Sequence, residues 1–313
     1  MLRSRTAARA CKTGPGTRGS GVGLAAILFL LVCPVEAALT GADKLSSAYE
    51  LILSAQFDRA DAALKQACPP APRESCIVLD VVSLWWRIQI DPGDTSRDAL
   101  FNDRARGAIK SAEAWTDRDP KNAEAWFYLA GSYAPLVQWQ VLRGERLGAA
   151  RNGNRVRQTL EHALALDPAL ADAHFGIGIY EYYADVASAG AKMLRFLLFL
   201  PGGDRVKGLQ AIDQTRQSGS LLRGEADFQR YIIDIWYEHR PDEALAILKS
   251  LDARYPTNPI FLQRIAEMYQ TYFHDVRASA AAWQMLIDRA RSDRVYDSAR
   301  VIALAERKRR ENF

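Results

Sequence analysis

The sequence has 313 residues, of which 49% are apolar and 25% charged, as in an ordinary soluble protein that can bury a sizeable core. Its formal net charge is +4, and five lysine and arginine residues precede Glu36, the first acidic residue. Without that segment the chain is close to neutral. This argues against nucleic acid as a partner, because nucleic-acid binding needs a concentrated basic face.

The first 37 residues have the order of a secretory signal. A basic stretch is followed by the apolar run 24–32 and then by Val35 and Ala37, so we expect cleavage after Ala37. The second alternative is a lipoprotein signal with the lipid on Cys33, although the bulky Val32 fits that motif poorly, and the third is an uncleaved anchor helix. All three predict an exported chain in the periplasm or cell envelope, with a helical domain over 38–313.

Two cysteines, Cys68 and Cys76, remain in the mature part, and three prolines lie between them. Export permits a disulfide, so we predict a bridge from the end of one helix to the start of the next. Two separate buried thiols are the alternative. No histidine or further cysteine lies nearby in the sequence, which argues against a metal site.

Apolar residues at helical spacing dominate the rest of the chain, and prolines divide it into segments. Pro120, Pro168 and Pro256 each end a segment, and a short polar step and a new helix follow each of them. A proline stops one helix, and the chain restarts as its neighbour. We expect about five or six helix pairs from Asp43 to Ala290 and a final helix near Tyr296 to Arg310.

Within the pairs, large and small residues recur in a fixed order. Trp126, Leu129, Ala130 and Tyr133 give the order of a first helix, and the second helix has an order of its own, with small and large residues before a closing proline. The further matches are Leu160, Ala163 and Pro168; His174, Ile177 and Gly178; Ala244, Leu248, Leu251 and Pro256; Leu262, Ile265, Ala266 and Tyr269; Ala278, Ala282 and Met285; and Ala48, Phe57, Ala60, Leu64 and Ala67.

This pattern, at roughly 34 residues per helix pair, resembles the tetratricopeptide repeat (TPR) family. The resemblance implies an all-α, TPR-like, right-handed superhelical solenoid of about five to six antiparallel helix pairs.

Two segments interrupt the array, near 138–154 and near 188–203. The second contains the apolar stretch 192–200. Our preferred interpretation is an inserted helix that packs against the solenoid. The alternative is an amphipathic segment that makes a peripheral contact with a membrane or a partner.

The sequence contains no motif for a nucleophile, a metal centre, a phosphate or a dinucleotide, so we expect no enzymatic activity and no cofactor. The four histidines, His162, His174, His239 and His274, do not pair at ligand spacing, and we assign them structural roles.

The TPR resemblance implies a concave surface that is lined by the first helix of each pair and binds a protein or peptide. The repeat spacing assigns nine residues to this groove: Phe127, Phe175, Ile179, Tyr182, Gln229, Ile233, Trp236, Gln263 and Gln270. We therefore predict a non-catalytic interaction scaffold. The alternatives are a membrane-associated TPR lipoprotein, or an envelope enzyme or small-ligand binder that uses the neighbourhood of His174, Glu181 and Asp185.

Overall fold

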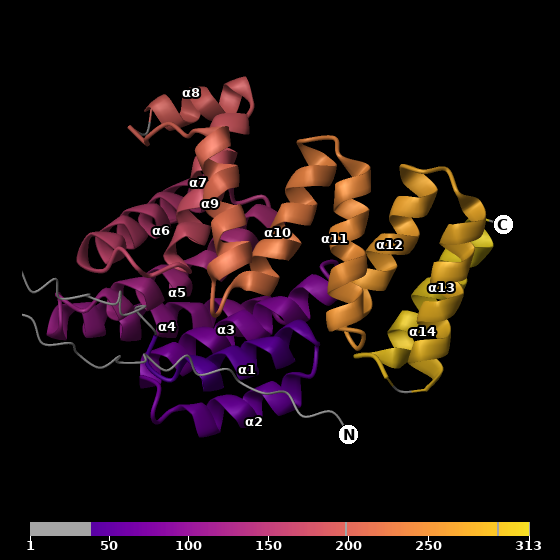
Figure 1. Cartoon of the computed structure of the whole chain (residues 1–313), viewed down its shortest axis with the longest axis horizontal. Helices are drawn as coiled ribbons and strands as arrows, with labels where there is room; N and C mark the ends of the chain where they lie inside the picture. Colours follow the sequence, from indigo (N-terminus) through magenta and orange to yellow (C-terminus); the bar gives the residue numbers. More distant parts are fainter. Residues whose placement is uncertain (1–38, 198, 293, 313) are drawn as a thin grey trace, which may run out of the picture. The chain divides into compact units, whose positions relative to one another are not determined.

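The computed structural model describes residues 39–312 except 198 and 293, so the expected signal segment, with Cys33 and the cleavage position, lies outside the described residues. The described part contains fourteen helices and no strand (Figure 1). The helices are α1 (Ala42–Leu53), α2 (Phe57–Ala67), α3 (Arg73–Ile90), α4 (Asp98–Arg118), α5 (Ala123–Leu142), α6 (Arg146–Leu166), α7 (Ala173–Val186), α8 (Ala189–Leu197), α9 (Arg205–Ser218), α10 (Arg223–Trp236), α11 (Pro241–Arg254), α12 (Pro259–Thr271), α13 (Val276–Arg291) and α14 (Ser298–Asn312).

Helices α4, α6 and α11 end just before the prolines that the sequence marks as stops. The residues that follow them, Asp119, Asp167 and Tyr255, have non-helical backbones. The cause is local, because a proline disfavours the helical conformation of the residue before it. Asn122 and Asn258 then begin α5 and α12, since each side chain accepts hydrogen bonds from free N–H groups of the new first turn.

Successive helices pack as six pairs: α1 with α2, α3 with α4, α5 with α6, α7 with α9, α10 with α11, and α12 with α13. Helix α14 packs on α13. Small residues at the predicted packing positions, including Ala130, Ala163, Ala244 and Ala266, are buried. The prediction of an all-α array of helix pairs is therefore confirmed.

The two interruptions of the array differ in structure. Residues 138–154 lengthen α5 and α6, which are joined by a three-residue turn at 143–145. Residues 188–203 contain α8 and stand between the paired helices α7 and α9. The first segment therefore deepens one helix pair, whereas the second adds a separate helix.

We expected helix α8 to pack against the solenoid, and the structure differs from this expectation. It lies beyond the ends of α7 and α9 (Figure 1), and Met193, Phe196 and Phe199 are 67%, 77% and 94% exposed. The interpretation of a helix packed against the solenoid is wrong for these three side chains, which face outward.

The first helices also contact helices far along the chain. Asn258 donates a hydrogen bond from its side chain to the carbonyl of Leu53, over 2.8 Å, and Ser46 donates to the carbonyl of Ser220. The ring of Trp86 on α3 lies 5.1 Å from that of Phe228 on α10. One apolar core thus joins residues from both ends of the described chain.

Cys68 and Cys76 form a disulfide, the pairing expected from the sequence, with their Cα atoms 6.4 Å apart. Cys68 follows the last residue of α2, and Cys76 lies in the first turn of α3. None of the described helices is both long and apolar enough to cross a membrane.

Candidate functional site

A cavity of about 650 Å³ opens on the side of the array where α3, α5, α6, α7 and α10 meet. Tyr49 of α1, the start of α8 and Leu200 complete its lining. A cavity of this size accommodates a small molecule or a short peptide segment.

The walls of the cavity are mainly apolar. Each of the surrounding helices contributes large side chains, among them Trp85, Phe127, Val137, Val156, Phe175 and Ile179. Tyr180 and Tyr183 add two phenol rings from α7. The walls therefore favour an apolar ligand surface through burial and ring contacts.

Polar groups gather around Glu225, which is part of the cavity lining. This residue lies in the first turn of α10 and is only 4% exposed. The hydroxyl of Tyr49 and the indole N–H of Trp86 donate to the same carboxylate oxygen, over 3.2 and 3.1 Å, and the amide of Gln229 lies 3.5 Å from the other oxygen. Gln138 accepts a hydrogen bond from Trp85 beside this group.

Burial raises the pKa of Glu225, because a charged carboxylate is poorly solvated there. The hydrogen bonds from Gln229, Tyr49 and Trp86 act in the opposite direction, since they stabilise the charged form. The result is a buried acid whose neighbours donate to it.

Asp172 also lines the cavity, but its carboxylate is already occupied. It accepts from the backbone N–H groups of Ser220, Leu221 and Leu222 and from the Ser220 hydroxyl. Asp172 therefore holds the loop before α10 in place. Of the two acids, Glu225 is the one that can accept a further hydrogen bond.

Four of the nine predicted groove residues line this cavity: Phe127, Phe175, Ile179 and Gln229. They come from three different helix pairs, so the repeat spacing brings them together as expected.

Tyr182 and Ile233 are not groove residues. Both are fully buried in a second apolar cluster between α7, α9 and α10, and neither lines the cavity. The assignment of these two residues to the groove is wrong because their helix faces pack against α9.

The other three predicted residues lie outside the cavity lining. Trp236 is 64% exposed at the end of α10, while Gln263 and Gln270 are half-buried on α12. Sequence analysis missed Glu225, Trp85 and Tyr183 as cavity residues. The one signal in the sequence was Glu225, an acidic residue on the otherwise apolar face of α10.

The alternative site around His174, Glu181 and Asp185 does not face the cavity. Burial lowers the pKa of His174. One carboxylate oxygen of Asp185 accepts from the backbone N–H of Arg205 at the start of α9. This contact gives Asp185 a structural role, and none of the three residues is among those that line the cavity.

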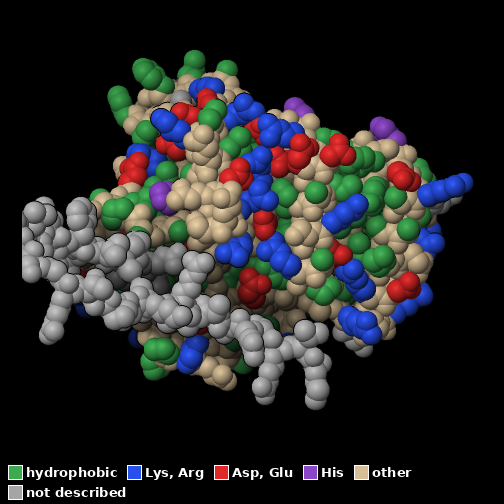
Figure 2. All heavy atoms as spheres, in the orientation of Figure 1, with side chains coloured by type: hydrophobic (Ala, Val, Ile, Leu, Met, Phe, Trp, Pro, Cys, Tyr) green, Lys and Arg blue, Asp and Glu red, His purple; other side chains and the backbone are tan. Residues whose placement is uncertain are grey.

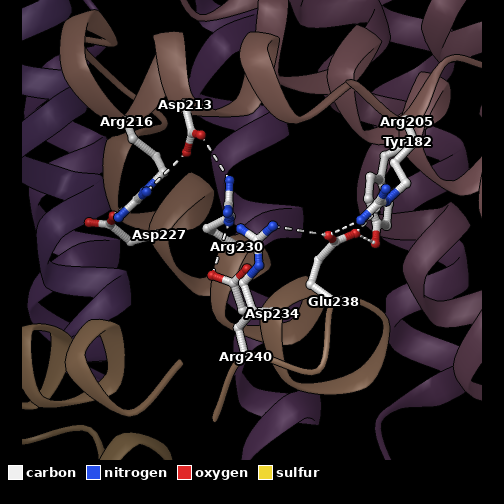
Figure 3. Close-up of polar contacts among 9 residues, drawn as sticks. All are labelled: Tyr182, Arg205, Asp213, Arg216, Asp227, Arg230, Asp234, Glu238 and Arg240. Carbon is white, nitrogen blue, oxygen red and sulfur yellow. Dashed lines mark hydrogen bonds and ion pairs between the residues drawn. The ribbon is translucent and has the colours of Figure 1, made fainter. Parts of the chain in front are cut away.

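A second polar cluster joins α9 to α10 through alternating acids and arginines (Figure 3). Arg216 bridges Asp213 and Asp227 over 3.0 and 2.7 Å, and Arg230 bridges Asp213 and Asp234 over 2.8 and 3.0 Å. Charged side chains of both signs gather over this part of the surface (Figure 2).

At one end of this cluster, Glu238 accepts a hydrogen bond from the hydroxyl of Tyr182 over 2.6 Å and pairs with Arg205 and Arg240. The hydrogen bond from Arg205 is the main reason that the pKa of Glu238 lies below its ordinary value. Because the charges compensate one another, we interpret the cluster as a support for the helix pairs.

No family model matches the chain, and no curated protein matches it. Among solved structures, it is similar to a thermophilic TPR protein of Thermus thermophilus, at 15% identity, over 85% of this chain and 98% of that chain, with a TM-score of 0.29. A TM-score this low does not support an inference about the fold, which is instead established by the helix pairs described above. Within residues 39–312, as far as they are described, no three His, Cys, Asp or Glu residues are grouped as metal ligands.

Proposed function

We propose that the protein is a non-catalytic interaction protein of the cell envelope that holds an apolar segment of a partner protein in the cavity. The observation that carries this proposal is that Phe127, Phe175 and Ile179, from separate helix pairs, line one apolar cavity. Stacked helix pairs commonly bind extended partners along such a surface.

The chemistry of the lining favours binding over hydrolysis. A nucleophilic mechanism needs a serine, cysteine or threonine beside a general base. Ser188 is the one such residue among the described residues of the lining, its oxygen lies 3.4 Å from the backbone nitrogen of Ala191, and no histidine accompanies it there. Glu225 has hydrogen-bond donors around it and no nucleophile.

Two observations support the envelope location. The first 37 residues have the order of a secretory signal. The disulfide between Cys68 and Cys76 is of a kind that persists mainly in oxidising compartments.

A glycine in the cavity wall offers a direct test of binding. Gly153 lies within α6, and a Cβ added there meets no atom within 4 Å. Gly153→Trp therefore fills the cavity without displacing the core. Gly107→Trp is the matched control, because Gly107 is an exposed glycine on α4 with equally open surroundings, away from the cavity.

The probes are peptides of about twelve residues, selected from a random display library on the purified chain. We expect Gly153→Trp to weaken their binding by at least about tenfold, since the lost contacts are worth over about 1.4 kcal/mol. Gly107→Trp binds like the wild type. Equal affinities for Gly153→Trp and the wild type would show that the cavity is not the binding site.

We also propose that α8 makes a peripheral contact with an anionic membrane. Met193 and Phe196 on α8 and Phe199 just after it are exposed apolar side chains. The exposed Lys192 and Lys207, which pair with Asp185 and Asp204, lie near them in the chain. Apolar side chains flanked by basic ones are typical of helices that lie in the membrane interface.

Sedimentation with phosphatidylglycerol vesicles tests the membrane contact. Phe196→Ser and Phe199→Ser together reduce the bound fraction, because both rings leave the interface. Trp236→Ser, which removes an exposed aromatic residue on α10, is the control and leaves it unchanged. If the control lowers vesicle binding as much as the double variant, α8 is not the contact.

A further inference from the structure

Among the described residues Glu225 has no positively charged partner, unlike the buried acids Asp234 and Asp252. Asp234 pairs with Arg230 over 3.0 Å, and Asp252 pairs with Arg289 over 2.6 Å. Asp172 is surrounded by backbone N–H groups instead. Within the described part of the chain, the interactions of Glu225 are with Tyr49, Trp86, Gln138 and Gln229, all of them uncharged.

The neighbours of Glu225 donate hydrogen bonds to it, which favours the charged carboxylate and partly offsets the larger effect of burial on its pKa. Two of them, Tyr49 and Trp86, donate to one oxygen. The other oxygen has the amide of Gln229 at 3.5 Å, the limit of a hydrogen bond. This second oxygen therefore retains capacity to accept a hydrogen bond.

A carboxylate enclosed by apolar walls is costly unless a cation compensates it. The basic residue in the cavity lining is Arg146, at the first position of α6, and its side chain is exposed and solvated. A positively charged ligand group beside Glu225 would compensate this carboxylate and favour its charged form against the effect of burial.

We propose that the cavity binds, beside Glu225, a primary ammonium group on an aliphatic stem, such as a lysine side chain of the partner segment. The ammonium donates to the oxygen of Glu225 that has only the long contact from Gln229, and the stem lies along Trp85, Phe127 and Phe175. This inference rests on the proposed function, because it names the chemistry of the segment that enters the same cavity.

The consequence is selectivity by the end group of the ligand. An ammonium gains a charge-assisted hydrogen bond, an alcohol gains a weaker neutral one, and a carboxylate is repelled by Glu225. Ligands with the same apolar stem should therefore rank in that order.

The test uses n-octylammonium, n-octanol and octanoate, titrated calorimetrically into the full chain near neutral pH. We expect octylammonium to bind at least about tenfold more tightly than octanol, and octanoate to bind most weakly. Equal affinities for the three probes, or no binding of octylammonium, would overturn the inference. This ranking needs no variant, so it stands even if a variant folds poorly.

Glu225→Gln then assigns the preference to this residue, since glutamine keeps the shape and an acceptor oxygen but removes the charge. In this variant octylammonium and octanol should bind alike, and retained octanol binding shows that the cavity is intact. An ammonium preference that survives Glu225→Gln contradicts the inference. The proposed function is tested separately, because Gly153→Trp should weaken the binding of peptides and of octanol alike, whatever the end group of the ligand.

Discussion

Helices α7 and α9 approach each other closely at two glycines, Gly178 and Gly208. A Cβ added at Gly208 would lie 2.6 Å from the backbone nitrogen of Tyr182 and 2.8 Å from the carbonyl oxygen of Gly178. Both are backbone atoms, so neither can rotate away. To restore an ordinary contact of 3.4 Å, the helices must separate by roughly 0.8 Å at this point.

Gly208→Ala should therefore destabilise the protein. Overpacking costs about 3 kcal/mol where backbone atoms must move, and a gap of this width forfeits part of the dispersion energy along the helix contact. The better helix propensity of alanine returns about 1 kcal/mol. The expected net loss is about 2 kcal/mol, which lowers the melting temperature by roughly 5 °C in a chain of this size.

Gly107→Ala provides the matched control. Gly107 is also inside a helix, but an added Cβ there meets no atom within 4 Å. Only the propensity gain remains, so this variant should be more stable by up to about 1 kcal/mol. Thermal and urea unfolding of both variants, followed by circular dichroism, gives the comparison. If Gly208→Ala is as stable as Gly107→Ala, the two helices do not approach as closely as described.

Three further outcomes are expected. Replacing both Cys68 and Cys76 by serine should lower the free energy of unfolding by about 2–3 kcal/mol in urea titrations, because the unfolded chain loses a short closed loop. The pKa of Glu238 is lowered in the folded protein, so its ionised form stabilises the fold above its unfolded pKa of about 4.3. This stability is lost as the pH falls through the lower folded pKa. Melting curves of Glu238→Gln should therefore depend less on pH in that acidic range. Tyr182→Ala should cost about 3–5 kcal/mol, measured by urea unfolding, since this ring is fully buried.

The helix boundaries were predictable because their causes are local. A proline acts on the residue before it, and Asn122 and Asn258 act on N–H groups two or three residues ahead. These effects need no knowledge of distant parts of the chain. The repeat spacing assigns Phe127 and Phe175 to one surface, and both line the cavity, while their role in binding stays a prediction.

The errors at Tyr182 and Ile233 arise from the faces of α7 and α10. Tyr182 follows Gly178 by four residues, so both lie on the side that packs against α9. Ile233 follows the buried Ala226 by seven residues and shares its face in the same way. The small residues indicated the packed face, but the general repeat pattern assigned these positions to the groove.

The polar groups around Glu225 were beyond sequence analysis. Glu225 lies 176 residues from Tyr49 and 139 from Trp86 along the chain, yet contacts both. The outward orientation of α8 was equally hidden, because an apolar stretch of nine residues is compatible with burial or exposure. Only the packing of the surrounding helices decides between them.

The contacts of α1 with the segment from Ser220 to Asn258 bear on how the chain acquires its structure. In an open array, each repeat can form as soon as its neighbour is present. Here the hydrogen-bond partner of Leu53 is Asn258, 205 residues later in the chain, and that of Ser46 is Ser220, 174 residues later. The amino-terminal helices therefore lack some of their contacts until most of the polypeptide has been synthesised. For the same reason, removing whole repeats from the carboxyl end removes the hydrogen-bond partners of α1. Such long loop closures slow folding, so this chain should fold as one late, cooperative unit.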